Sequence, residues 1–276
     1  MLPLDPIVRK FTWANVRACA ERCAGAYAAE TGCTGLGPGH IVTNARTDTL
    51  ALVMDEGTCL SVAFRGSRNL RDWIQDFKAL RKHPRVGLTW SYKYEVEGEV
   101  HEGFLENVES VVEDLIHTIA GLIQPRLVDK SVVPIFVTGH SKGAAECTLF
   151  ALELVRQGFN VAGVYPIESP RLFNAAGARL YNAATMTNGL SLRDITFRIV
   201  NQNDIVPRVP LWTMGYRHCG QLVFLETWQG WSLNPGLWYQ LASDVLGLYG
   251  AWRHKGDVLL ADHSLANVQQ RIQMIT

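Results

Sequence analysis

Residues 132–155, VVPIFVTGHSKGAAECTLFALELV, decide the fold class of this chain. The first seven residues are apolar and largely β-branched, which predicts a short buried strand. The stretch from Ala144 onward has the composition and length of a helix. Between them Ser141 stands in a Gly-x-Ser-x-Gly sequence, on a predicted sharp turn from strand to helix. This arrangement presents a serine hydroxyl as a nucleophile, so the stretch indicates acyl-transfer chemistry at Ser141.

The two glycines of this motif have a physical reason to be there. The turn forces strained backbone angles on the serine, and side chains at Gly139 and Gly143 would collide with the neighbouring strand and helix. A motif of five residues is short, so the prediction depends on the strand before it and the helix after it.

Composition sets the broad class of protein. A chain of 276 residues fits a single large α/β domain over residues 1–276, with a core that needs no disulfides or metals to hold it. A hydrophobic content of 47% with 19% charged residues is typical of a globular protein. Lys plus Arg and Asp plus Glu are equal at 26 each, which argues against a nucleic-acid partner.

Targeting and redox signals are few. No apolar run approaches the roughly 18 residues of a transmembrane helix, and the first residues do not resemble a signal peptide. We therefore expect a cytoplasmic protein, or a mature or truncated secreted form, and see no feature that specifies an oligomeric state. The six cysteines have no CxxC spacing of a zinc site, so we expect buried free thiols. The acyl-transfer chemistry indicated for Ser141 needs neither a metal nor a cofactor.

Alternating strands and helices predict a mostly parallel central sheet with helices on both faces. Besides the elements around Ser141, we expect helices near 13–30, 69–78, 104–123 and 175–186, and from about 263. Strands are expected at 49–55, 59–65, 161–167, 195–200 and 221–225, and an exposed hairpin at 86–101.

A serine nucleophile needs a base, usually a histidine, oriented by a carboxylate. Asp204 lies just beyond the predicted strand 195–200, at the end where α/β folds place their chemistry. Asp262 directly precedes His263, and residues adjacent in sequence seldom point at each other. Asp204 is therefore the predicted acid.

Three histidines follow the predicted acid. His218 begins a strand-like segment and is expected to be structural, and His254 lies in a basic turn and is expected to be solvated. His263 stands where a loop meets the last helix, from which its side chain can reach Ser141. It is the predicted base.

Five segments, taken together with His263, resemble the class 3, fungal-type (Rhizomucor/Thermomyces-like) lipase family, which has the α/β-hydrolase fold. The resemblance covers about residues 49–265. The segments are FRGS at 64–67, VHEGF at 100–104, GHSKG at 139–143 (the nucleophile elbow, the turn that carries Ser141), ESPR at 168–171 and NDIVPRVP at 203–210.

The resemblance implies roles for particular residues. Ser141, Asp204 and His263 would form a catalytic triad, and Ser67 with the backbone N–H of Lys142 would form the oxyanion hole. Asp76 would support the Ser67 hydroxyl. A short lid helix would occupy residues 68–78, with an apolar face that meets lipid; the alternative is a fixed helix packed on the core. The residues of that face are Leu70, Trp73, Ile74 and Phe77.

The implied function is hydrolysis of carboxylic esters of lipids, triacylglycerols first, through an acyl-enzyme. The expected partner is a lipid ester substrate at an oil–water or membrane interface. The alternatives are a phospholipase A1, an esterase of soluble esters such as a feruloyl esterase, and a non-catalytic binding module on a hydrolase scaffold.

Two residues depart from the family pattern. Lys142 stands where the family has an apolar residue, which predicts a more polar site and argues against purely long-chain fats. Glu168 stands where the family has a small residue.

Overall fold

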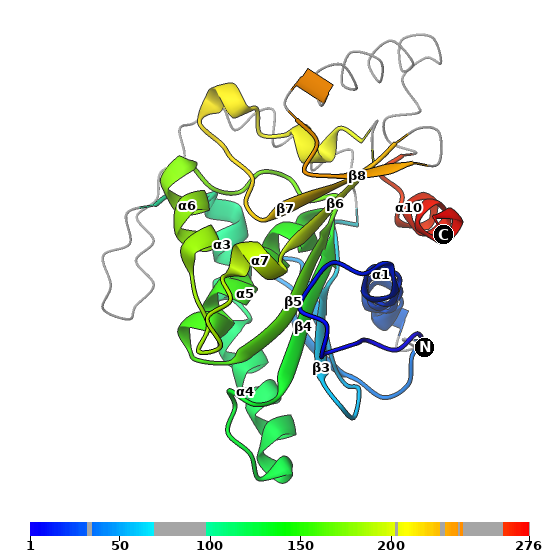
Figure 1. Cartoon of the computed structure of the whole chain (residues 1–276). Coiled ribbons are helices and arrows are strands. Elements are labelled where there is room, and N and C mark those ends of the chain that lie inside the picture. Colours follow the sequence, from blue (N-terminus) through cyan, green and yellow to red (C-terminus); the bar gives the residue numbers. More distant parts are fainter. Residues whose placement is uncertain are drawn as a thin grey trace.

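The computed structural model describes residues 1–31, 35–68, 98–201, 204–226, 230–236, 238–239 and 262–275. These residues form one eight-stranded sheet whose strands follow the order of the chain, β1-β2-β3-β4-β5-β6-β7-β8 (Figure 1). The strands are β1 (His40–Asn44), β2 (Thr49–Asp55), β3 (Leu60–Phe64), β4 (Pro134–His140), β5 (Asn160–Ile167), β6 (Phe197–Asn201), β7 (Gln221–Leu225) and β8 (Trp231–Leu233).

The direction of the strands changes across the sheet. β1, β2 and β3 are antiparallel neighbours, β3 to β7 run parallel, and β8 returns antiparallel to β7. The parallel centre agrees with the sequence prediction. β3 and β4 are buried along almost their whole length, as strands covered on both faces must be.

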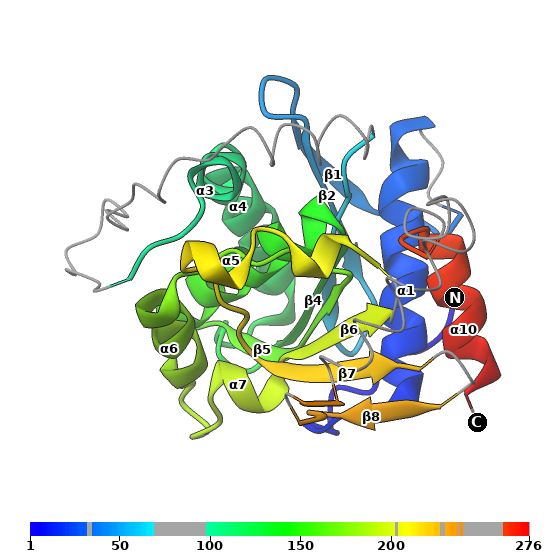
Figure 2. The same cartoon turned by 90° about the horizontal axis from the view of Figure 1, so that it is seen from above.

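Helices cover both faces of the sheet. The views in Figures 1 and 2 place α3 to α7 on one face, and α1 and α10 on the other, where both termini also lie. The helices are α1 (Trp13–Ala28), α3 (Glu102–Glu109), α4 (Val112–Ile123), α5 (Lys142–Arg156), α6 (Ala175–Ala183), α7 (Leu192–Ile195) and α10 (Leu265–Met274). Short 3₁₀ turns are η1 (Ala29–Thr31), η2 (Gln124–Arg126), η3 (Val206–Arg208) and η4 (Trp212–Met214).

The first and last helices pack side by side. Thr12 caps α1 by accepting a hydrogen bond from the Asn15 N–H, and Arg17 of α1 donates to the carbonyl of Ile272 in α10 at 3.3 Å. Apolar residues of both helices join one core cluster with β4 to β7. This packing fixes the start of α10, and therefore His263, against the sheet.

The structure corrects several element predictions. β1 was not predicted, and the helix expected over 104–123 is two helices, because the chain breaks at Ser110 and Val111. The strand expected from residue 195 begins at Phe197. Ser191 and Asp194 form a capping box that starts α7 instead. The hairpin expected at 86–101 and the lid expected at 68–78 lie almost wholly outside the described residues.

Two further observations bear on the class of protein. Among the described helices, none combines the length and the apolarity that crossing a membrane demands. Cys33 lies outside the described residues. The other five cysteines are buried free thiols, as predicted: Cys19, Cys23, Cys59, Cys147 and Cys219.

Candidate active site

Ser141 occupies a strained turn between β4 and α5. Its backbone angles are φ 58° and ψ −126°, a conformation that residues with a side chain rarely adopt. Its N–H donates to the carbonyl of Ile167 at 2.9 Å, and its carbonyl accepts from the Ala144 N–H at 2.9 Å. Both bonds tie the turn to its neighbours, so the strain is held by β5 on one side and α5 on the other.

The glycines of the motif lie where backbones come close together. A Cβ at Gly143 would lie 2.5 Å from the carbonyl oxygen of Phe64 and 2.6 Å from that of Arg65, at the end of β3. A Cβ at Gly139 would collide with the carbonyl oxygen of Gly143. The close approach brings the start of α5 against the end of β3, where Ser67 follows.

Asp204 and His263 form a buried pair. His263 donates Nδ1–H to Oδ2 of Asp204 at 2.5 Å, and the two side chains are 3% and 0% exposed. Oδ1 of Asp204 accepts the N–H of Val206 at 2.8 Å, which fixes the carboxyl plane. With Nδ1 protonated, Nε2 of His263 carries the lone pair of the neutral ring. The pair thus has the geometry in which a carboxylate sets the tautomer of a base.

His263 of this pair and Ser141 line the same cavity, which has a volume of about 510 Å³. Oγ of Ser141 and Nε2 of His263 are both buried, and neither has a hydrogen-bond partner among the described residues. Catalytic hydrogen bonds of this kind are often long before substrate binds. The cavity is lined by Ala24, Tyr27, Ser67, His140, Ser141, His263, Ser264, Leu265, Ala266 and Gln269.

His140, which precedes Ser141, supports the base His263 through a hydrogen bond to its backbone. Its Nε2–H donates to the backbone carbonyl of His263 at 2.9 Å, and its Nδ1 accepts from the hydroxyl of Tyr27 at 2.9 Å. The two imidazole rings lie 4.7 Å apart. Burial, and then the neighbouring His263, lower the pKa of His140 well below its ordinary value, so this ring stays neutral. Sequence reasoning missed this role of His140 and of Tyr27, because only the fold brings α1, β4 and the start of α10 together.

The oxyanion side is built at the start of α5. The N–H of Lys142 lies in the first turn of α5, where backbone N–H groups have no partner inside the helix and the helix dipole favours negative charge. Ser67 lines the same cavity from the end of β3. Asp76, expected to support the Ser67 hydroxyl, lies outside the described residues, as do Leu70, Trp73, Ile74, Phe77 and His254.

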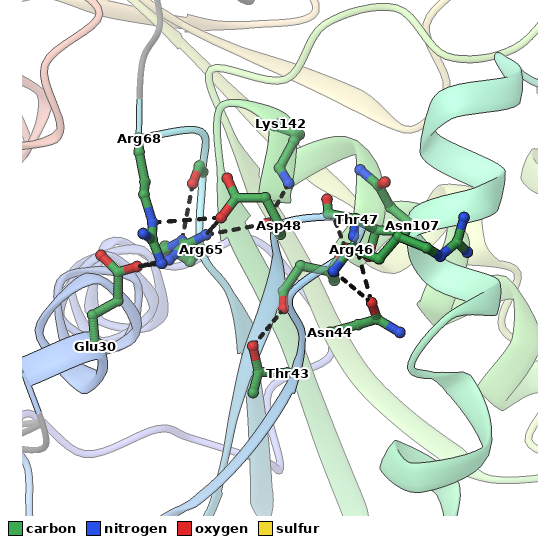
Figure 3. A network of polar contacts seen from close by, with 12 residues as sticks. Glu30, Thr43, Asn44, Arg46, Thr47, Asp48, Arg65, Arg68, Asn107 and Lys142 are labelled. Atoms are coloured by element: carbon green, nitrogen blue, oxygen red, sulfur yellow. Dashed lines mark hydrogen bonds and ion pairs between the residues drawn. The ribbon is translucent and has the colours of Figure 1, made fainter.

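The Lys142 side chain does not line the cavity. Its ammonium donates to the backbone carbonyl of Asp48 at 2.7 Å (Figure 3). It also pairs with Glu146, one helical turn on, at 3.4 Å. Asn107 of α3 donates to the same Glu146 oxygen at 2.7 Å. The sequence predicted a more polar cavity because of this lysine. That reason is wrong, because the ammonium binds Asp48 and Glu146 inside the protein.

Arg65 extends this buried cluster. It pairs with Glu30 and with Asp48, and Arg68 joins the same two carboxylates from the surface (Figure 3). We call Glu30, Asp48, Arg65, Lys142 and Glu146 the oxyanion-side network. It anchors the turn between β1 and β2 to the residue that carries the expected oxyanion donor.

Glu168 lies on the opposite side of the nucleophile, directly after β5. It is fully buried at φ 55°, in the left-handed region that favours glycine. The sequence marked it as a departure. In the structure its Oε1 accepts the N–H of Asn201 at 2.7 Å, and the N–H of Asp204 donates to the carbonyl of the same Asn201 at 3.1 Å, so the two acids are neighbours.

The other candidate groups are accounted for. His218 donates Nε2–H to the carbonyl of Pro207 at 2.8 Å, which agrees with a structural role. The carbonyl of Asp262 accepts from the Asn201 amide. The described part of the chain contains no group of three or more His, Cys, Asp or Glu side chains that could hold a metal ion.

Comparison with known proteins places this geometry in a family. The family model "Lipase (class 3)" matches residues 61–214. The secreted mono- and diacylglycerol lipase A of Penicillium cyclopium is 34% identical over 174 residues, 62% of this chain and 50% of its own length. The lipase of Rhizomucor miehei is 30% identical over 181 residues, 63% of this chain and 44% of its own length. The chain thus spans about half the length of these relatives.

The fold is shared with solved structures of the same kind. A crystal structure of a mutant of the Penicillium cyclopium protein MDLA superposes with a TM-score of 0.59 at 26% identity, covering 77% of each chain. The mixed sheet and its flanking helices are those of the α/β-hydrolase fold, as the sequence predicted. Because the family model matches more than half of its residues, this chain belongs to the class 3 lipases.

Proposed function

We propose that this protein hydrolyses carboxylic esters of lipids, with acylglycerols as its first substrate class. The observation that carries the proposal is the buried Asp204–His263 pair, whose free Nε2 shares a cavity with the strained Ser141. The Penicillium and Rhizomucor relatives support the lipid ester as substrate, because both are named as lipases.

In this proposal Ser141 attacks the ester carbonyl while His263 Nε2 takes the hydroxyl proton. Asp204 holds the ring and stabilises the imidazolium that forms. The negative charge on the former carbonyl oxygen is met by Ser67 and the N–H of Lys142, where one preorganised donor typically contributes about 2.7–4 kcal/mol. His263 then protonates the leaving alcohol, and water releases the acid by the same route in reverse.

Substitution of Ser141 tests this function. Ser141→Ala should reduce hydrolysis of a p-nitrophenyl ester by about 10⁶-fold, the order found when a triad serine is removed. A fluorophosphonate probe should label the wild-type protein and not the variant. Retained activity in the pure variant would exclude the mechanism, and an unlabelled wild-type protein would favour a binding module.

The substrate class is tested by an ester panel of increasing acyl length, run below and above the solubility limit. A lipase acting at an interface should become faster above that limit, and an esterase of soluble esters should not. Diacyl phospholipids in the same panel separate a phospholipase A1 from an acylglycerol lipase.

A further inference from the structure

Glu168 is held in place by the sheet that carries the acid. Its N–H donates to the carbonyl of Ile199 at 2.9 Å, and its Oε1 accepts the N–H of Asn201 at 2.7 Å, both in β6. Asn201 also donates from its amide to the carbonyl of Asp262 at 2.9 Å. The Glu168 carboxyl is therefore fixed on β6, and Asn201 links it to the residue that precedes His263.

The neighbouring buried acid is Asp204, because its N–H donates to the carbonyl of the same Asn201 at 3.1 Å, and it is as fully buried as Glu168. Both oxygens of Asp204 accept hydrogen bonds, from Val206 N–H and from His263 Nδ1–H. Oε2 of Glu168 receives no donor from the described residues. Two buried carboxyl groups that face each other cannot both be ionised. The remaining oxygen, Oε2 of Glu168, is thus the place for the proton that they share.

The charges around Glu168 favour its neutral form. Burial, and then the carboxylates of Asp204 and Asp262, raise the pKa of Glu168 well above its ordinary value. Arg198 of β6 is a cation close enough to Glu168 for their charges to interact, and Arg271 binds the side chain of Asn201. His263 lies beyond Asp204, to which it donates Nδ1–H.

We propose that Glu168 is a positioning residue, which in its protonated form donates Oε2–H to the Asp204 carboxylate and holds Asp204 against His263. This rests on the proposed function of the triad and extends it to a chain of Glu168, Asp204, His263 and Ser141. The proton stays on Glu168 through the reaction, so the buried acid side keeps one negative charge. Ionisation of Glu168 at a higher pH adds a second charge and drives the two carboxyl groups apart.

Two substitutions separate this role from a purely structural one. Glu168→Gly suits the left-handed backbone and removes the donor, whereas Glu168→Gln keeps a donor that cannot ionise. We expect kcat/KM to fall about 10- to 100-fold in the glycine variant, the range found when an outer-shell partner of a metal-binding histidine is removed. The glutamine variant should recover most of this activity, and its activity should persist to higher pH than that of the wild type. Leu127→Gly is the matched control, because Leu127 is exposed at φ 53°, at the end of η2, and does not line the cavity.

The protonation itself can be seen without activity. The infrared difference spectrum of wild type minus Glu168→Gln at neutral pH should contain the carbonyl band of a protonated carboxylic acid, shifted in D₂O. The same difference taken in a Ser141→Ala background should keep the band, so the result stands even if the proposed function fails. Absence of the band, or an alkaline limb of kcat/KM that Glu168→Gln leaves unmoved, overturns the proposal.

Discussion

Glu146 and Glu168 are both fully buried glutamates beside the nucleophile, and their surroundings are opposite. Glu146 lies on α5, five residues after Ser141, where Lys142 and Asn107 contact one of its oxygens. Glu168 follows Ile167, whose carbonyl binds the Ser141 N–H, and it faces Asp204. The same residue type at the same depth thus meets a cation on one side of Ser141 and a carboxylate on the other.

The difference shows that neighbours, and not burial alone, decide the charge of a buried acid. Burial raises the pKa of Glu146, but Lys142 and Asn107 oppose it. At Glu168 burial and its strongest neighbour, Asp204, act in the same direction. The oxyanion-side network can therefore hold an ion pair between Lys142 and Glu146. On the other side of Ser141, which we call the acid side, a neutral Glu168 lies against the carboxylate of Asp204.

The largest effect is expected from breaking the ion pair. Lys142→Met leaves Glu146 buried without its cation and should lower the free energy of unfolding by about 3 kcal/mol at neutral pH, the lower end of the range for such pairs. The loss should shrink as the pH falls toward the raised pKa of Glu146, because the buried acid is then protonated with or without Lys142. Urea denaturation at several pH values measures both.

The double variant Lys142→Met with Glu146→Gln is the control, since it removes both charges. It should regain part of the lost stability, because a neutral amide can still accept from Asn107. If the double variant is no more stable than Lys142→Met, the buried charge is not the cause.

This contrast also marks the limit of what the sequence could predict. The elbow, Asp204 and His263 were found because strand ends and chain order are local signals, and the parallel centre of the sheet follows from strands alternating with helices. Lys142 was assigned to the cavity from its place next to Ser141. The direction of its side chain depends on Asp48, in a turn after the unpredicted strand β1.

Glu168 illustrates the same limit from the other side. Its sequence position shows that a small residue has been replaced, but its partner lies 36 residues away, beyond β6. Only the pairing of β5 with β6, at Ile167 and Ile199, brings Glu168 to Asp204. Contacts made across neighbouring strand ends carry no local pattern, so they must be read from the fold.

A pH-dependent difference in stability should distinguish the two glutamates. Above the ordinary glutamate pKa of about 4.3 the unfolded chain loses the proton that folded Glu168 keeps. The folded state then binds more protons, so the free energy of unfolding falls with rising pH, by up to about 1.4 kcal/mol per pH unit, until the raised pKa is reached. Glu168→Gln lacks this loss, and its stability relative to wild type should rise with pH.

Glu146→Gln is the matched comparison for that measurement. Burial also raises the pKa of Glu146 in the wild type, but Lys142 and Asn107 limit the rise. The gain in stability of Glu146→Gln over wild type should therefore end at a lower pH. Denaturant midpoints of the two variants and the wild type between pH 4 and 9 are sufficient. Curves for Glu168→Gln and wild type that run parallel would contradict a neutral Glu168.

The smallest effect is expected at Tyr27, whose hydroxyl lies between the two sides. It donates to Nδ1 of His140 on the acid side, and a Cβ at Gly66, next to Ser67, would collide with it. Tyr27→Phe leaves Nδ1 of the neutral His140 ring without a donor in a buried place, which should lower the free energy of unfolding by about 1 kcal/mol. Because His140 Nε2 still holds the carbonyl of His263, kcat should fall only a few-fold with little change in KM.

Tyr181→Phe is the control, because it also removes a buried hydroxyl, one that is hydrogen-bonded to Thr196 at 2.8 Å and does not line the cavity. This variant should lose similar stability without the fall in kcat. If both variants lower kcat alike, His140 is not the route by which Tyr27 supports the base.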